Sequence, residues 1–192
     1  MRSGEFIVVD KVMQHSSLRF LRRLLDDAQL SWTASSPGLA GRNGTYQLID
    51  RRMHLAPTMN IIKMLVCLVV SRELGRHGFR LPNCFVQAFP VRMWGSALLP
   101  PSQTPHLDSW RKGRFVHHPL FTCIFYVATE CIRGGNLVGL SSSDPAGRIF
   151  DVKPKANRLV LMSGRQWHMV DPLYSGMRTS CVMNFYKSLK KS

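Results

Sequence analysis

The second half of this chain contains short apolar segments separated by turn-forming residues, and this pattern restricts the fold more than any other feature of the sequence. Six segments are rich in Val, Ile, Phe and Tyr, and Pro, Gly, Ser and Asp separate them. They are Phe85–Trp94, Leu120–Thr129, Leu137–Ser141, Arg148–Val152, Arg158–Ser163 and Arg178–Tyr186. Several short strands at near-regular spacing are typical of an antiparallel sandwich or barrel. We therefore expect a β core over about residues 83–187.

The first half of the chain is predicted to be helical. Leu18, Leu21 and Leu25 recur at intervals of three and four, which predicts an amphipathic helix over about residues 17–30. A second helix is predicted over about 58–77. The glycine-rich segment 35–44 lacks the Gly-Lys-Ser/Thr ending of a phosphate-binding loop, so we expect a flexible loop, with a substrate flap as an open alternative. No linker divides the chain, which predicts a single α+β domain over 1–192 with its helical part at about 1–80.

The chain is strongly basic, with 26 Lys and Arg against 11 Asp and Glu and a formal net charge of +15. A field of this sign favours anionic partners such as nucleic acid, phosphorylated or carboxylated ligands, or acidic protein surfaces. The apolar fraction of 45% is ordinary for a globular protein and excludes a disordered basic tail. Charge alone does not choose among these partners, and the sequence does not indicate an oligomeric state.

The five cysteines form no Cys-x-x-Cys pair, which argues against a disulfide framework or a thiolate zinc site. This usage indicates a reducing compartment, so we expect a cytoplasmic protein. Residues Met1–Asp10 show no signal-peptide pattern. The longest apolar run, Ile61–Val70, is interrupted by Lys63 and is shorter than the roughly 20 residues of a membrane span. We therefore expect a core helix there and no membrane partner.

Three residues have the types and spacing of a metal site. His106 and Asp108 lie two positions apart, so in an extended chain both side chains point to the same side. His168 follows the apolar segment Arg158–Ser163 and can supply a third ligand. Two histidines and one carboxylate are the facial triad of non-heme Fe(II) oxygenases, which leaves coordination positions open for a co-substrate and dioxygen. The alternatives are a surface His-Asp pair and a core histidine beside Trp167.

Arg178 follows His168 by ten residues and is predicted to enter the same cavity. We expect Tyr174–Gly176 to form a turn that returns the chain along a neighbouring strand. A guanidinium that lies deeper in the cavity than the metal can bind a carboxylate through two parallel hydrogen bonds. Ser180 lies on the same strand face and can add a hydrogen bond from its hydroxyl. A metal and a fixed cation in one cavity suit a dicarboxylate 2-oxo acid. The alternative for Arg178 is a solvated charge in an arginine-rich chain.

The order His-x-Asp, His and Arg, with Gly134-Gly135 between the two halves, resembles the Fe(II)/2-oxoglutarate-dependent dioxygenases, and most of all their prolyl-hydroxylase branch. The stretch from Leu120 to Val127 is similar to a strand of the oxygen-sensing prolyl hydroxylases. The resemblance covers about residues 83–187. It implies that Tyr126 hydrogen-bonds the distal carboxylate of 2-oxoglutarate, although a plain core position is the alternative. It also implies that Trp94 stands where the family has an active-site tyrosine.

The resemblance implies a double-stranded β-helix (jelly roll) with the N-terminal helices on its outer face. The implied cofactors are Fe(II) bound by His106, Asp108 and His168, 2-oxoglutarate, dioxygen, and ascorbate as a reductant. The implied reaction is hydroxylation of an aliphatic C–H bond, on a prolyl or other peptide side chain or on a small molecule, anionic ones included, with release of succinate and CO2. Asp108 is intact, which favours a hydroxylase over a halogenase. The segment after Arg178 does not follow the RxNxTxR run of the nucleic-acid demethylases.

Two other functions stay open at this point. The first is a catalytically silent jelly roll that binds nucleic acid or another anionic partner through its charge. The second is an oxygenase with a nucleic-acid-bound substrate, and we favour neither over a peptide or small-molecule substrate. The basic residues that follow Asp108 are either a substrate entrance or a solvated loop, and we expect His117 and His118 to lie in a loop or at the surface.

Overall fold

The computed structural model describes residues 5–26, 32–34, 45–48, 56–79, 84–112 and 114–187. The elements of the first half are β1 (Phe6–Asp10), α1 (His15–Asp26), β2 (Trp32–Ala34), β3 (Thr45–Leu48), α2 (Ala56–Arg76) and β4 (Cys84–Trp94). Those of the second half are β5 (Gln103–His106), β6 (Trp110–Lys112), β7 (Phe115–His117), β8 (Phe121–Gly134), β9 (Leu137–Leu140), β10 (Arg148–Val152), β11 (Arg158–Ser163), β12 (Trp167–Val170) and β13 (Leu173–Lys187).

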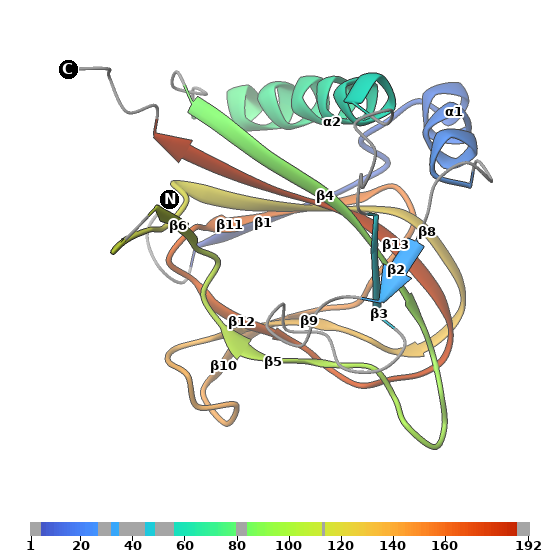
Figure 1. Cartoon of the computed structure of the whole chain (residues 1–192), viewed down its shortest axis with the longest axis vertical. Coiled ribbons are helices and arrows are strands. Elements are labelled where there is room, and N and C mark those ends of the chain that lie inside the picture. Colours follow the sequence, from blue (N-terminus) through green and yellow to red (C-terminus); the bar gives the residue numbers. More distant parts are fainter. Residues whose placement is uncertain are drawn as a thin grey trace.

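Two antiparallel sheets face each other, as Figure 1 shows. The larger sheet has the strand order β1-β11-β8-β13-β4-β3-β2, and the smaller sheet has the order β10-β9-β12-β5. Strands β6 and β7 form a separate hairpin. Strands that are neighbours in a sheet are often distant in the chain, as with β5 and β12. This arrangement is a double-stranded β-helix with two helices, and it confirms the predicted α+β jelly roll.

The two helices cover the outer face of the larger sheet (Figure 1). The odd-numbered side chains of β8 from 121 to 127 pack in one apolar cluster with α1 and α2, whereas Ile124 and Tyr126 pack in a second cluster with residues of β9, β10 and β11. Leu18, Leu21 and Leu25 form the buried stripe of α1, and burial of each such side chain contributes about 1.5–3 kcal/mol. The period of two along β8 therefore separates the helix-facing core from the space between the sheets.

Most predicted elements are found close to their expected places. The helix predicted over 17–30 corresponds to α1, although the last part of the predicted range, 27–30, lies outside the described part of the chain. The helix predicted over 58–77 corresponds to α2. Each of the six predicted strand segments corresponds to a strand, although Leu120 and Ser141 lie just outside β8 and β9, and two have the predicted bounds, β10 and β11. The glycine-rich segment 35–44 lies outside the described residues. Among the described helices, none is long and apolar enough to span a membrane.

The turn predicted at Tyr174–Gly176 is wrong, because these residues lie inside β13. The pairing of β13 with β8 shifts register between Leu173 and Met177, and Gly176 has a φ of 79° there. At Asp171–Pro172 the chain passes from the smaller sheet to the larger one, because Val170 pairs with Leu137 of β9 and Leu173 pairs with Gly134 of β8. A bulge inside a strand uses the same small and flexible residues as a tight turn, so composition alone did not distinguish them.

The prediction that the first half is helical is only partly right, because β1, β2 and β3 also lie there. Strand β1 pairs with β11 at the edge of the larger sheet, and β3 pairs with β4. The four-residue strands β5 and β12 were also not predicted. Each of these strands is too short to show a clear period of two, and all of them except β2, which pairs with β3, are held by a partner that is distant in the chain.

The Gly134-Gly135 pair connects β8 to β9 in a conformation that other residues rarely adopt. The φ angles are 83° and 72°, and a Cβ on Gly134 would lie 2.1 Å from the carbonyl oxygen of Pro172. We expect Gly134→Ala to lower the free energy of unfolding by about 1–3 kcal/mol from backbone strain, plus the cost of the clash. Urea denaturation measures this change. Gly75→Ala is the matched control, since no atom lies within 4 Å of its added Cβ. It should stabilise helix α2 by about 0.5–1 kcal/mol. Equal losses of stability in both variants would contradict the prediction.

Candidate metal centre

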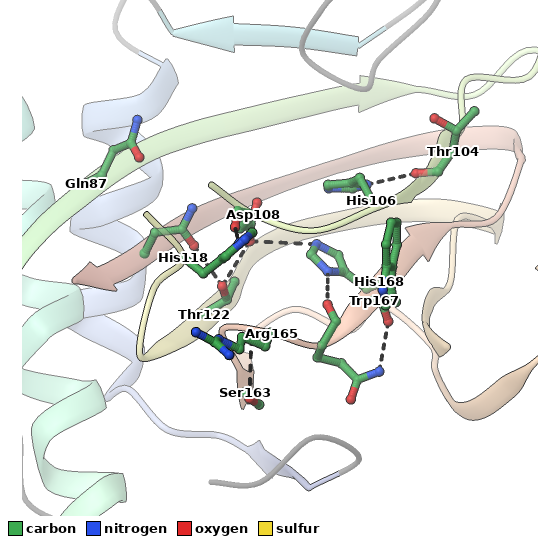
Figure 2. A network of polar contacts seen from close by, with 12 residues as sticks. Gln87, Thr104, His106, Asp108, His118, Thr122, Ser163, Arg165, Trp167 and His168 are labelled. Carbon is green, nitrogen blue, oxygen red and sulfur yellow. Dashed lines mark hydrogen bonds and ion pairs between the residues drawn. The ribbon is translucent and has the colours of Figure 1, made fainter. Parts of the chain in front are cut away.

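The three predicted metal ligands meet at one end of the smaller sheet. His106 ends β5, and the antiparallel register places it directly opposite His168 on β12. Their ring centroids are 4.3 Å apart. Asp108 follows in the segment between β5 and β6, and its Oδ2 lies 3.8 Å from Nε2 of His168 (Figure 2). One ligand atom from each residue lies within 4.8 Å of the others, so all three can bind a single ion.

The hydrogen bonds of the two histidines leave the same ring nitrogen available on each. Nδ1 of His106 lies 2.8 Å from the carbonyl oxygen of Thr104, and Nδ1 of His168 lies 2.9 Å from that of Gln166 (Figure 2). A carbonyl can only accept, so each Nδ1 carries the proton and each Nε2 keeps a lone pair for a metal. Burial and the neighbouring His168 lower the pKa of His106. Neutral imidazole is therefore the preferred form of His106, as metal binding requires.

The backbone next to the carboxylate is held by a residue that sequence reasoning missed. His118 lies in the loop between β7 and β8, as predicted, but it is half-buried, and its Nδ1 donates a hydrogen bond to the carbonyl oxygen of Asp108 at 2.9 Å. Its neighbour His117 ends β7, and its ring lies 5.4 Å from that of Trp110. No local sequence signal distinguishes His118, because its partner is reached only through the β6–β7 hairpin.

A cavity between the two sheets joins the metal ligands to Arg178. The lining of this cavity contains His106, Asp108 and His168 together with Tyr126, Arg178 and Ser180. Arg178 is only 4% exposed, and its Nη1 donates to the carbonyl oxygen of Gly135 at 2.9 Å. Its Nε and Nη2 point to the sulfur of Met93, at 3.2 and 2.9 Å. No carboxylate within the described part of the chain forms an ion pair with Arg178, so the guanidinium is a buried cation without a counter-charge.

Tyr126 offers a second unsatisfied group in the same cavity. Its side chain is fully buried, and among the described residues its hydroxyl is the buried side-chain polar atom that lacks a hydrogen-bond partner. The guanidinium carbon of Arg178 lies 5.7 Å from the Tyr126 ring centroid. Burial raises the pKa of Tyr126, and burial lowers the pKa of Arg178. Leaving buried polar groups unpaired is costly, which indicates that a ligand with an anionic oxygen completes this end of the cavity.

The structure brings Ser180 to the cavity but not Trp94. Ser180 is buried, lies two residues after Arg178 on the same face of β13, and pairs with Tyr126 across the strands. Trp94 is 41% exposed at the end of β4, where the guanidinium of Arg92 lies over its ring. Side chains alternate along a strand, so the inward position is taken by Met93 and the neighbouring Trp94 points away.

Residues 97–186 match the sequence model of the 2OG-Fe(II) oxygenase superfamily. These residues belong to that superfamily. The suspected enzyme class, a 2-oxoglutarate-dependent dioxygenase, is therefore confirmed, and a silent binding module is not retained. Fe(II) and 2-oxoglutarate are the cofactor and co-substrate of this superfamily. The chemistry of the site fits both, because a donor set of two imidazoles and one carboxylate is present and a buried cation lacks an anion.

Solved structures of the superfamily share the fold over nearly the whole chain. An oxidoreductase of the 2OG-Fe(II) oxygenase family from Burkholderia pseudomallei is 18% identical with a TM-score of 0.68, covering 94% of this chain and 84% of that chain. A prolyl hydroxylase from Trichoplax adhaerens, in complex with a hypoxia inducible factor peptide fragment, is 17% identical with a TM-score of 0.61, covering 95% and 84%. HygX from Streptomyces hygroscopicus, with nickel, 2-oxoglutarate and hygromycin B bound, is 13% identical with a TM-score of 0.64, covering 97% and 84%. No curated protein sequence matches the chain.

Proposed function

We propose that this oxygenase hydroxylates an aliphatic C–H bond, with His106, Asp108 and His168 as the ligands of Fe(II). The observation that carries the proposal is the uncompensated Arg178 guanidinium in the same cavity as the three ligands. A cavity with metal ligands at one place and a buried cation at another suits a co-substrate with a chelating end and a distal carboxylate. When bound, the iron and 2-oxoglutarate supply the oxidising power of the reaction, and succinate and CO2 are released.

The protein contributes binding, orientation and exclusion of water. Arg178 binds the distal carboxylate, the Tyr126 hydroxyl donates to the same group, and Ser180 lies near enough along β13 to add a hydroxyl bond. The carbonyl of Gly135 holds one side of the guanidinium, and the sulfur of Met93 holds another. Because thioether sulfur and one carbonyl neutralise little of the charge, the cation stays available for a carboxylate. Trp94 is not part of this proposal, because its side chain is turned away from the cavity.

The proposed substrate is a peptide side chain, including a prolyl residue, or a small molecule. A prolyl hydroxylase in complex with a peptide fragment and HygX with hygromycin B bound are both among the structures that share the fold, so the fold is compatible with either kind of substrate. The net charge of +15 favours encounter with anionic molecules, 2-oxoglutarate included. Asp108 supplies the carboxylate ligand that distinguishes a hydroxylase from a halogenase.

The function is tested by turnover of 2-oxoglutarate in the purified protein with Fe(II) and ascorbate. Proline-containing peptides and small aliphatic molecules are added in parallel, and succinate is measured. We expect succinate formation that a chelator abolishes and that rises when a true substrate is present, with a gain of one oxygen atom in that substrate by mass spectrometry. Absence of succinate with every substrate, together with absence of 2-oxoglutarate binding in calorimetry, would contradict the proposal.

A further inference from the structure

A hydrogen-bonded pair of buried side chains lies behind the carboxylate of Asp108. Thr122 on β8 and Asn184 on β13 are directly opposite each other in the register of the larger sheet. They are 1% and 2% exposed. Oγ1 of Thr122 lies 2.9 Å from Oδ2 of Asp108 and 2.8 Å from Oδ1 of Asn184 (Figure 2 shows Thr122 and Asp108). The larger sheet is thus joined to the metal ligand through a single hydroxyl group.

The number of available hydrogens determines which of these side chains donates and which accepts. A threonine hydroxyl has one hydrogen, and an ionised carboxylate can only accept, so Thr122 must donate to Asp108 whenever Asp108 is charged. The contact between Thr122 and Asn184 then needs a donor, which only the amide nitrogen of Asn184 can supply. The two ends of an amide are exchanged by a half-turn of the side chain, so Asn184 presents its NH2 group to Thr122. The chain of donors runs from Asn184 through Thr122 to Asp108.

The same chain extends away from the metal ligands. Beyond Asn184 lies Tyr186, whose hydroxyl donates a hydrogen bond to Oε1 of Gln87 at 3.3 Å. The hydroxyl of Tyr186 has a single proton, which it donates to Gln87, so the donors that lead to Asp108 are Asn184 and Thr122.

Asp108 needs such support more than the two histidines do. His106 and His168 are placed by the ladder between β5 and β12, but Asp108 lies outside any strand. Its backbone is held by His118, and its carboxylate is held by Thr122. We propose that Thr122 and Asn184 are positioning residues that orient the carboxylate of Asp108 for metal binding, an inference that rests on the proposed function.

The test compares metal affinity in the absence of 2-oxoglutarate, with Mn(II) alone as the probe in calorimetry. Thr122→Val keeps the shape and removes the hydroxyl, and we expect it to weaken Mn(II) binding by about 10- to 100-fold. Thr122→Ser keeps the hydroxyl and should bind Mn(II) as the wild type does. Asn184→Leu should weaken binding less, and the double variant should be no weaker than Thr122→Val, because Asn184 acts through Thr122. The apparent KM for Fe(II) should rise in Thr122→Val while the KM for 2-oxoglutarate stays unchanged.

Thr179→Val is the matched control, because Thr179 is also a buried threonine of the larger sheet but bonds Arg92 outside the cavity. It should leave the Mn(II) affinity unchanged. Wild-type affinity in Thr122→Val, or a loss of affinity in Thr122→Ser, would overturn the inference. If Thr122→Val does not fold, Thr122→Ser and Asn184→Leu decide the question. Absence of Mn(II) binding in the wild type would instead contradict the proposed metal site.

Discussion

His106→Ala is expected to abolish turnover of 2-oxoglutarate and to weaken Mn(II) binding by more than about 100-fold, the upper range for loss of a group that only supports a ligand. Each histidine can bind the metal only through Nε2, because each Nδ1 is hydrogen-bonded to a backbone carbonyl. With one imidazole gone, a single histidine and Asp108 remain, which is too few protein ligands to hold Fe(II) in the facial arrangement. Calorimetry with Mn(II) and succinate detection measure the two effects.

The control for this variant is His77→Ala, an exposed histidine that follows α2. It should bind Mn(II) and form succinate as the wild type does. The unfolding temperature of the metal-free protein should be nearly the same for both variants, because His106 forms its hydrogen bond to its own strand and not to the core. Tight Mn(II) binding by His106→Ala would contradict the site as assigned.

Arg178→Met is expected to raise the KM for 2-oxoglutarate by roughly 30- to several-thousand-fold. Truncating one partner of a buried, hydrogen-bonded charge pair typically costs about 2–5 kcal/mol, and this range follows at about 1.4 kcal/mol for each tenfold. Binding of Mn(II) should stay unchanged, since Arg178 contacts none of the three metal ligands. The loss should disappear with 2-oxopentanoate, which carries a methyl group in place of the distal carboxylate. Steady-state kinetics with both 2-oxo acids measure this difference.

The same variant tests the physical origin of the site. A buried cation without a counter-charge destabilises the ligand-free fold, so Arg178→Met should unfold at the same or a higher temperature than the wild type when no co-substrate is present. Added 2-oxoglutarate should stabilise the wild type but not the variant. Arg133→Met, at an exposed strand position where Arg133 lies over Tyr174, is the control. An unchanged KM for 2-oxoglutarate in Arg178→Met would show that the carboxylate binds elsewhere.

Local pattern predicted those parts of the fold that are long and strongly periodic. Leu18, Leu21 and Leu25 mark α1 because helix geometry repeats every 3.6 residues, and the same three side chains are buried against the sheet. Segment Arg158–Ser163 was predicted with its observed bounds, because its four inner residues are apolar and it is paired on both sides, by β1 and β8. Strands β1, β5 and β12 were missed, since four or five residues carry little periodic signal and their stability comes from distant partners.

The candidate site shows the same division. The spacing of His106 and Asp108 was sufficient to place their side chains on one side of the chain, because an extended backbone alternates. The roles of Tyr126 and Arg178 remain predictions, but both residues do line the cavity. Trp94 was assigned to the site by resemblance, but it is exposed while its neighbour Met93 is buried, because successive side chains on a strand point to opposite faces. His118, Thr122 and Asn184 were not identified, because none has a neighbour in the sequence that reveals its partner.

The sequence alone therefore determined the kinds of groups available: the ligand types, the arginine, the alternating strands and the amphipathic helix, all of which depend on residues close together in the chain. Only the tertiary structure decided which of these groups meet. The register of β5 on β12 places His106 opposite His168, and the pairing of β8 with β13 joins Tyr126 to Ser180 and Thr122 to Asn184. Pairing between distant strands is selected by burial of the whole core, so no local stretch of sequence specifies it.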